Sequence, residues 1–312
     1  MASADFVIGM IFLSQTIVGI LGNFFLLYHY TYLELTRYTV RHTDLILRHL
    51  TVANSLVLLS KGVPQTMAAF GLKHFLSDIG CKLVFYVHRV GRGVCIGHTC
   101  LLSIFQAITI SPTDSWWAEM KSQTHKFLGL SNVLCWILNL LVSIVVPMCV
   151  THEWTSKNNT RKMDLGYCYG VVDNRIALMF HNVFLLSYDV SCVGIMIWAS
   201  GSMVFILYRH KRRVQHIHST NLSPSSSLES RVTRSILVLV ITFVSFYTSS
   251  HILILYMVLS HNPSRWLVSI SALITSGFPT VSPLVLLIRD RRTLRVSSAC
   301  LRRSVPFHNL FM

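Results

Sequence analysis

Long runs of apolar residues recur seven times along the chain, separated by short segments that hold most of its charged residues. A run of about 18 or more residues with few or no charges is long enough to cross a bilayer as a helix. We therefore expect an all-α membrane protein, a seven-transmembrane helix bundle built as a single domain over residues 1–312. The expected spans are 6–31, 44–71, 80–110, 127–151, 176–208, 233–260 and 266–288.

Composition supports a membrane protein and changes how the net charge is interpreted. Hydrophobic residues make up 52% of the chain and charged residues 12%, whereas a soluble domain is usually about 25% charged. The net charge of +15 would suit a nucleic-acid-binding protein, but the basic residues lie between the apolar runs. This distribution is typical of a protein oriented in a lipid bilayer, so we expect no nucleic-acid partner.

The distribution of Lys and Arg also predicts an orientation. Of the 27 Lys and Arg residues, 17 fall in the segments on one side of the expected bundle and seven on the other. The richer side should be cytoplasmic, which places the N-terminus outside the cell and the C-terminus inside. The expected location is the plasma membrane, which the chain crosses several times.

Two features of the expected outer side agree with this orientation. Asn158 begins an Asn-Asn-Thr glycosylation sequon in the loop between the fourth and fifth spans. Cys81 begins the third span and Cys168 lies in the same outer loop, where an oxidising environment permits a disulfide. Cys149, near the outer end of the fourth span, is the alternative partner.

The third span contains two charged residues, Arg89 and Arg92, which are hard to reconcile with a lipid environment. A charge at mid-membrane costs about 2.5 to 3.5 kcal/mol on insertion scales, so such residues almost always face the bundle interior. Asp189 in the fifth span lies at a depth similar to both arginines, so an Arg89–Asp189 or an Arg92–Asp189 pair would fit. Purely structural arginines, bonded to helix carbonyls or reaching outward, are the other interpretation. The candidate ligand-binding residues are Lys61, Tyr86, His88, Arg89, Arg92 and Asp189.

The sequence contains no motif of an intramembrane enzyme, such as Gly-x-Gly-Asp, Gly-x-Ser-Gly or His-Glu-x-x-His. His210, His216 and His218 lie among Lys and Arg without a nearby cysteine or acid, which indicates a solvated extension of the fifth helix. We therefore expect no enzyme, no metal site and no cofactor.

Several long segments carry a resemblance to a known family. The topology is similar to that of a G-protein-coupled receptor, yet the third span ends in "AITISP" without an Asp/Glu-Arg-Tyr triplet, and the seventh has "FPTVSPLVL" without Asn-Pro-x-x-Tyr. The segments "KGVPQTMAAFG", "CKLVFYVHRVGRGVCIG", "SIFQAITISP" and "SALITSGFPTVSPLVL" resemble vomeronasal type-1 receptors, and the resemblance covers nearly the whole chain. His98 departs from the pattern, which has a small hydroxyl residue there.

The resemblance implies a chemosensory receptor that binds small pheromone-like molecules, sulfated steroids among them, and activates an inhibitory-class G protein. A pocket for the anionic end of such a ligand would explain the surplus of buried positive charge. A bitter-taste-type receptor is the nearest alternative, although those receptors generally lack the cysteine pair, which we predict to be Cys81–Cys168. A solute transporter or channel is an alternative of another class, disfavoured because the sequence shows no internal repeat.

Two further hypotheses concern signalling. We expect the fifth and sixth helices to extend past the membrane, joined by a mobile Ser/Pro-rich link at 219–228. The residues expected to contact a G protein are Arg209, Lys211, Arg212, Arg213, Arg231 and Arg234. Pro279 and Pro283 interrupt the seventh helix and form the expected activation hinge, since proline removes a backbone donor.

Overall fold

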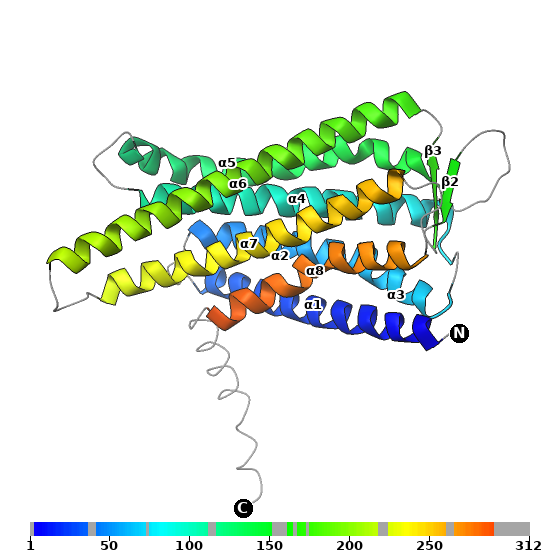
Figure 1. Ribbon diagram of the computed structural model, residues 1–312, viewed down its shortest axis with the longest axis horizontal. Coiled ribbons are helices and arrows are strands. Elements are labelled where there is room, and N and C mark those ends of the chain that lie inside the picture. The colour runs from blue at the N-terminus through cyan, green and yellow to red at the C-terminus, as the bar shows by residue number, and fades with distance from the viewer. Residues whose placement is uncertain are drawn as a thin grey trace, which may run out of the picture.

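The computed structural model is a bundle of long helices with a small β-sheet at one end (Figure 1). It describes residues 3–36, 42–72, 75–111, 117–151, 161–164, 167–172, 175–217, 224–259 and 265–289. The predicted seven-transmembrane bundle is confirmed. Six of the described helices are long and apolar enough to cross a membrane unbroken, and the remaining span is divided into shorter pieces. The unbroken spans lie in α1 (Ser3–Leu35), α4 (Asp78–Ile110), α5 (Trp117–Val142) with η2 (Ser143–Cys149), α6 (Arg175–Ile217), α7 (Pro224–Leu259) and α8 (Arg265–Arg289).

The second span is divided because a proline interrupts its hydrogen-bond ladder. It consists of α2 (His42–Val57), the π-helical turn η1 (Leu58–Gly62) and α3 (Val63–Ala69). Pro64 stands at the start of α3 and has no N–H to donate to the carbonyl four residues earlier. The wider π turn absorbs this defect and holds Lys61.

Helix α4 runs through the middle of the bundle and contacts α2, α5, α6 and α7. Ser77 caps its first turn by accepting a hydrogen bond from the Gly80 N–H at 3.2 Å. Gly91 allows α2 to approach closely, since a Cβ at that position would lie 3.0 Å from Val57 Cγ2 and 3.2 Å from the Ala53 carbonyl oxygen. Residues 90 to 100 are buried throughout, so any charge carried by this stretch faces protein.

A three-stranded antiparallel sheet covers the beginning of α4. Its order is β1 (Val150–Thr151), β3 (Tyr169–Val172), β2 (Arg161–Asp164). The predicted disulfide Cys81–Cys168 is confirmed, with the two Cα atoms 6.0 Å apart, and the alternative partner Cys149 is a free thiol. The Tyr167 ring stacks on Phe85 beside the bridge, at 5.7 Å between centroids. The disulfide therefore ties the sheet to the first turn of α4.

Helices α6 and α7 project beyond the rest of the bundle at the end opposite the sheet (Figure 1). The 43 residues of α6 span about 64 Å at 1.5 Å per residue, roughly twice the thickness of a bilayer core. Helix α7 already begins at Pro224, so the expectation of a mobile link as far as residue 228 was wrong for its second half. Proline is favoured in the first turn of a helix, because its missing N–H has no partner there anyway.

The segment of α8 from residue 279 to residue 283, which contains both prolines, is called the kink region. Neutral side chains fasten it to α1 and α2. Pro283 cannot donate to the Pro279 carbonyl, and the Asn23 side-chain amide from α1 donates to that oxygen at 2.8 Å instead. From α2, Asn54 Nδ2 donates to Ser282 Oγ at 2.9 Å. Both asparagines are almost completely buried. The freed carbonyl of Pro279 therefore has a donor from a neighbouring helix, as buried backbone in a membrane requires.

Candidate functional site

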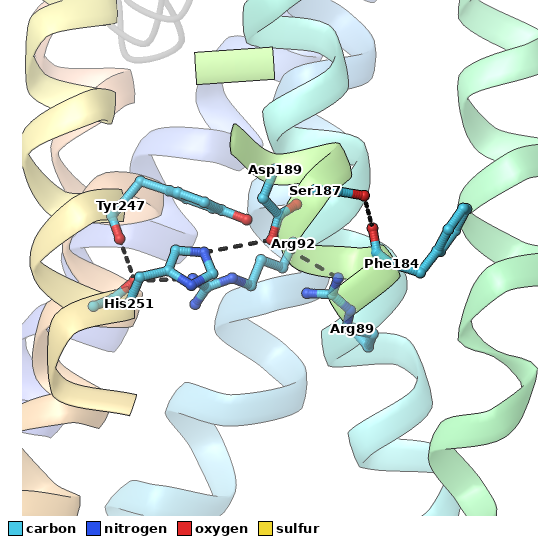
Figure 2. Close-up of polar contacts among 8 residues, drawn as sticks. Arg89, Arg92, Phe184, Ser187, Asp189, Tyr247 and His251 are labelled. Carbon is cyan, nitrogen blue, oxygen red and sulfur yellow. Dashed lines mark hydrogen bonds and ion pairs between the residues drawn. The ribbon is translucent and has the colours of Figure 1, made fainter. Parts of the chain in front are cut away.

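The two arginines of α4 have different partners. Arg89 Nη2 lies 3.9 Å from Asp189 Oδ2 on α6, within ion-pair distance but beyond a hydrogen bond. Arg92 Nη2 donates a hydrogen bond to Ser250 Oγ on α7 at 2.9 Å. Although they stand three residues apart on the same side of α4, Arg89 reaches α6 and Arg92 reaches α7 (Figure 2). Of the two pairs that the sequence left open, the structure forms Arg89–Asp189.

Asp189 links three helices at one point. Besides Arg89 from α4, its Oδ2 lies 3.4 Å from Nε2 of His251 on α7. The side chain is 3% exposed, and both charged neighbours stand at ion-pair distance from it and not at short hydrogen-bond distance. The Tyr247 hydroxyl is directed toward Asp189 (Figure 2). A buried carboxylate is thus held by charge more than by directed hydrogen bonds.

Arg92 lies against an aromatic wall. Its guanidinium carbon is 4.5 Å from the centre of the Tyr247 ring, a cation–π contact. The Tyr247 ring stacks on Phe243 at 5.0 Å, and Phe243 meets Phe278 edge-on at 4.7 Å. A cationic head beside several rings offers both halves of a site for an amphipathic anion.

A cavity of about 30 Å³ lies between Arg92 and this wall. Among its described lining residues, Arg92 alone carries a charge. The lining consists of Val57, Arg92, Cys95, Phe243, Phe246, Tyr247, Ser250, Ile274, Thr275, Phe278 and Pro279. Pockets that hold drug-sized ligands usually measure about 300 to 1,000 Å³, so this cavity is too small for such a ligand as it stands. It would admit such a ligand after its aromatic side chains and Arg92 shift.

Of the three other residues predicted for the ligand site, two lie near this centre. Lys61 and His88 are close enough to Arg92 to interact with it electrostatically, and between the two cations Lys61 and Arg92 this interaction is repulsive. Tyr86 points elsewhere, because its hydroxyl donates to the Leu140 carbonyl of α5 at 3.0 Å. The structure thus brings Lys61 and His88 near the arginines and leaves Tyr86 on another face of α4.

Sequence reasoning missed three residues of α7 that complete the site: Tyr247, Ser250 and His251. They belong to the segment "YTSSH", a polar interruption inside an otherwise apolar run. That interruption was a usable signal, because polar residues within a membrane span usually face the bundle interior. What it could not give is the rotation of α7, which decides that Ser250 rather than Thr248 meets Arg92.

The basic residues predicted for G-protein contact lie on the projecting parts of α6 and α7. Arg209, Arg212 and Arg234 are exposed, and Arg212 lies over the Tyr208 ring at 5.6 Å. Lys211, Arg213 and Arg231 belong to the same two helices, but their side chains fall outside the described set. Asn158 also lies outside the described residues. The expected hinge residues Pro279 and Pro283 are both inside α8.

Similarity to known proteins extends over almost the whole chain. Residues 6–299 match the model of the vomeronasal organ pheromone receptor family. The chain is 61% identical to vomeronasal type-1 receptor 3 of Homo sapiens, over 99% of each chain. It is 52% identical to vomeronasal type-1 receptor 2 of Homo sapiens, over 96% of this chain and 76% of that one. Olfactory receptor class A-like protein 1 of Danio rerio is 30% identical, over 94% and 92%.

The crystal structure of squid rhodopsin superposes with a TM-score of 0.73 at 13% sequence identity, covering 97% of this chain and 87% of that one. At such low identity the likeness shows the fold alone, a seven-helix bundle. The membrane-length helices and the family match make the chain a multi-pass protein of the plasma membrane. The family match decides against the bitter-taste-type and transporter alternatives, and its members are receptors, not enzymes. The chain belongs to the vomeronasal organ pheromone receptor family and is a chemosensory receptor.

Proposed function

We propose that this receptor detects a small amphipathic anion, such as a steroid sulfate, and passes the signal to an inhibitory-class G protein. The observation that carries the proposal is Arg92, a 9% exposed cation that faces an aromatic cavity and is held there by a neutral hydroxyl. A buried charge without a countercharge is costly, so an anion that reaches it gains more than it would in water. The aromatic wall provides apolar area for the body of the ligand.

The position of Arg92 suggests how binding is passed on. An anion at Arg92 competes with the Ser250 hydroxyl, which accepts a hydrogen bond from Arg92 and so joins it to α7. Phe246 and Tyr247 belong to the same helix and line the same cavity, so enlarging the cavity displaces α7. In this proposal the sheet end is extracellular, as the Lys and Arg distribution predicts. Helices α6 and α7 carry the displacement to the opposite end, where Arg209, Arg212 and Arg234 meet the G protein.

The ligand half of the proposal is tested in cells that express the receptor, by its calcium or cAMP response to a panel of volatile and sulfated compounds. Arg92→Gln keeps the size and hydrogen bonding of the side chain and removes its charge. We expect the potency of steroid sulfates to fall by about thirtyfold or more, in line with the 2 to 5 kcal/mol measured when a buried charge loses its partner. The neutral parent steroids should change far less.

Arg48→Gln is the matched control, because Arg48 pairs with Glu34 between α1 and α2, away from the cavity. Surface expression is measured for every variant. Equal potency losses for anionic and neutral agonists in Arg92→Gln would make this arginine structural and refute the anion site.

The G-protein half is tested by the double substitution Arg231→Gln and Arg234→Gln. If these residues contact the G protein, signalling falls while the surface level holds. A surface level that falls in proportion to the signal would assign the two charges to membrane topology instead. Lys82→Gln is the control at the other end, because Lys82 is a half-exposed residue on the first turns of α4 that pairs with Asp78 at 2.6 Å.

A further inference from the structure

A second and larger cavity opens between α1 and α8, near the end of the bundle that carries the sheet (Figure 1). Its volume is about 470 Å³, and pockets of about 300 to 1,000 Å³ hold drug-sized ligands. We call it the α1–α8 groove. Its lining consists of Val7, Ile8 and Ile11 of α1 and Trp266, Ser269, Ile270 and Leu273 of α8. Among these described lining residues none is charged, and Ser269 alone carries a hydroxyl.

The groove forms because α1 and α8 diverge toward the sheet. Deeper in the bundle they touch, since a Cβ on Gly19 would lie 2.9 Å from Thr280 Oγ1 and one on Gly22 would lie 3.0 Å from Pro283 Cγ. Ile11 stands eleven residues before Gly22, about three turns away on the same face of α1. A branched side chain here replaces the glycine, so the helices stand farther apart and leave a wedge between them.

The groove opens to the lipid and lies within one leaflet. Val7, Ile11 and Trp266 are 53%, 47% and 58% exposed on two helices of membrane-spanning length, so the groove is continuous with the surface that lipid covers. Leu273 lies eight residues after the start of α8 at Arg265, about 12 Å along a helix and less than half of a bilayer core. Trp266 lies near the mouth, where aromatic residues mark the membrane surface. The occupant therefore comes from the bilayer, and from its outer leaflet in the predicted orientation.

We infer that the α1–α8 groove binds a membrane sterol, with the ring system against Ile8, Ile11 and Ile270 and the sterol hydroxyl at Ser269. Isoleucine side chains are stiff because they branch at Cβ, so the wall is largely preformed. A rigid ring system loses little conformational freedom on such a wall, whereas a flexible acyl chain would have to be ordered. The single hydroxyl of a sterol matches the single hydroxyl of the lining, and a phosphate headgroup would find no cation among the described lining residues.

A sterol in the groove would lie against the same turn of α8 as the ligand cavity. Leu273 lines the groove, and the next residue, Ile274, lines the cavity at Arg92. Leu273 is also tied to α1, because Gln15 Nε2 donates to its carbonyl oxygen at 2.9 Å. A sterol that packs on both helices binds the folded receptor and therefore stabilises it. This inference stands independently of the proposed anion site.

The test uses the full receptor in phosphatidylcholine nanodiscs that contain natural cholesterol, its mirror image or no sterol. The mirror image has the same bulk effect on a bilayer but the wrong shape for a chiral groove. Natural cholesterol alone should raise the melting temperature, by several degrees. A diazirine analogue of cholesterol should label residues 7–11 and 266–273, and natural cholesterol should compete with it more effectively than the mirror image does.

Ile11→Trp fills the groove and should abolish both the labelling and the rise in melting temperature. Leu21→Trp is the matched control, because Leu21 is 65% exposed on the same helix and lies outside the described lining. If Ile11→Trp does not fold, Ile270→Trp fills the groove from α8. Ser269→Ala removes the hydroxyl and should weaken competition by cholesterol about twofold to tenfold.

Equal effects of cholesterol and its mirror image would overturn the inference, because the groove would then hold any lipid. Labelling confined to other segments, or labelling that persists in both tryptophan variants, would overturn it as well. The anion site is judged separately, by the potency of steroid sulfates on Arg92→Gln, so either proposal can fail while the other stands.

Discussion

Two buried polar regions lie within the same bundle and are held in opposite ways. Around the kink of α8, neutral groups meet at hydrogen-bond distance: Asn23 lies 2.8 Å from the Pro279 carbonyl and Asn54 lies 2.9 Å from Ser282. Around Asp189, charged groups approach only to 3.9 and 3.4 Å. The first region fastens helices with short, directed bonds, and the second holds its charges loosely.

This difference indicates separate roles. A short neutral hydrogen bond in an apolar medium is costly to break, and an anionic ligand does not strengthen it. We therefore expect the kink region to serve the fold and any bending of α8. A loosely held charge can exchange its partner for a ligand, so we expect the region between Arg89 and His251 to determine ligand selectivity. We therefore expect substitutions in the kink region to affect all agonists alike, and substitutions around Arg92 to separate anionic agonists from neutral ones.

The largest effect should come from the disulfide, which restrains the sheet above both regions. Replacing Cys81 and Cys168 together by serine should lower the free energy of unfolding by about 2 to 5 kcal/mol. Potency should fall for every agonist, because the end of the bundle that carries the sheet loosens. The melting temperature of receptor in lipid nanodiscs measures the change, with Cys149→Ser, a free thiol, as the control. A double-serine variant with the melting temperature of the wild type and a loss of potency for anionic agonists only would contradict the expectation that the disulfide serves stability alone.

The fold could be predicted from the sequence because each helix that crosses a bilayer needs a run of about 18 or more mostly apolar residues. Residues 6–31 and 266–288 are recognisable without any knowledge of their neighbours. The π turn at Lys61 and the sheet that begins directly after Cys168 follow from local backbone adjustments that hydropathy does not encode. The sequence indicated that Pro64 interrupts a helix, but not that the backbone would accommodate the missing hydrogen bond with a π turn.

Half of the site could likewise be predicted, for a physical reason. Arg89, Arg92 and Asp189 are conspicuous because a charge in a membrane span is expensive, and similar depth narrowed their pairing to two choices. Ser250 and Tyr247 are inexpensive in a membrane helix and give a weak signal. Which arginine meets Asp189 depends on how α6 and α7 are rotated against α4, and side-chain packing between helices decides that.

Asn23→Ala should produce the next largest effect and should be uniform across agonists. It leaves the Pro279 carbonyl buried without its donor, at a cost of about 1 to 3 kcal/mol. The melting temperature should fall, and the potencies of the steroid sulfate and the neutral parent should shift by the same factor. Ser14→Ala is the matched control, because Ser14 is exposed and donates only to the Ile11 carbonyl of its own helix among the described contacts. A selective loss of the sulfate response would place Asn23 in the ligand site.

Tyr247 provides a smaller and more selective test, since its ring and its hydroxyl can be removed separately. Tyr247→Phe keeps the face on which Arg92 lies and should leave the sulfate potency within about twofold. Tyr247→Leu removes the ring, and a cation–π contact of about 0.5 to 2 kcal/mol corresponds to a loss of roughly 2- to 30-fold. A larger loss in the phenylalanine variant would show that the hydroxyl toward Asp189, and not the ring, positions the charges.

The smallest effect expected is the coupling between Asn54 and Ser282. Each single alanine substitution should cost about 0.5 to 1.5 kcal/mol of stability. Asn54→Ala should cost more than Ser282→Ala, because Asn54 Oδ1 also accepts from Cys95 Sγ at 3.1 Å and that thiol would lose its partner. The double variant should cost less than the sum of the two singles, since the bond between them can be lost only once. Strict additivity in the melting data would mean that α2 and α8 are not joined by this bond, and the kink region would then resemble the loosely held region beside it.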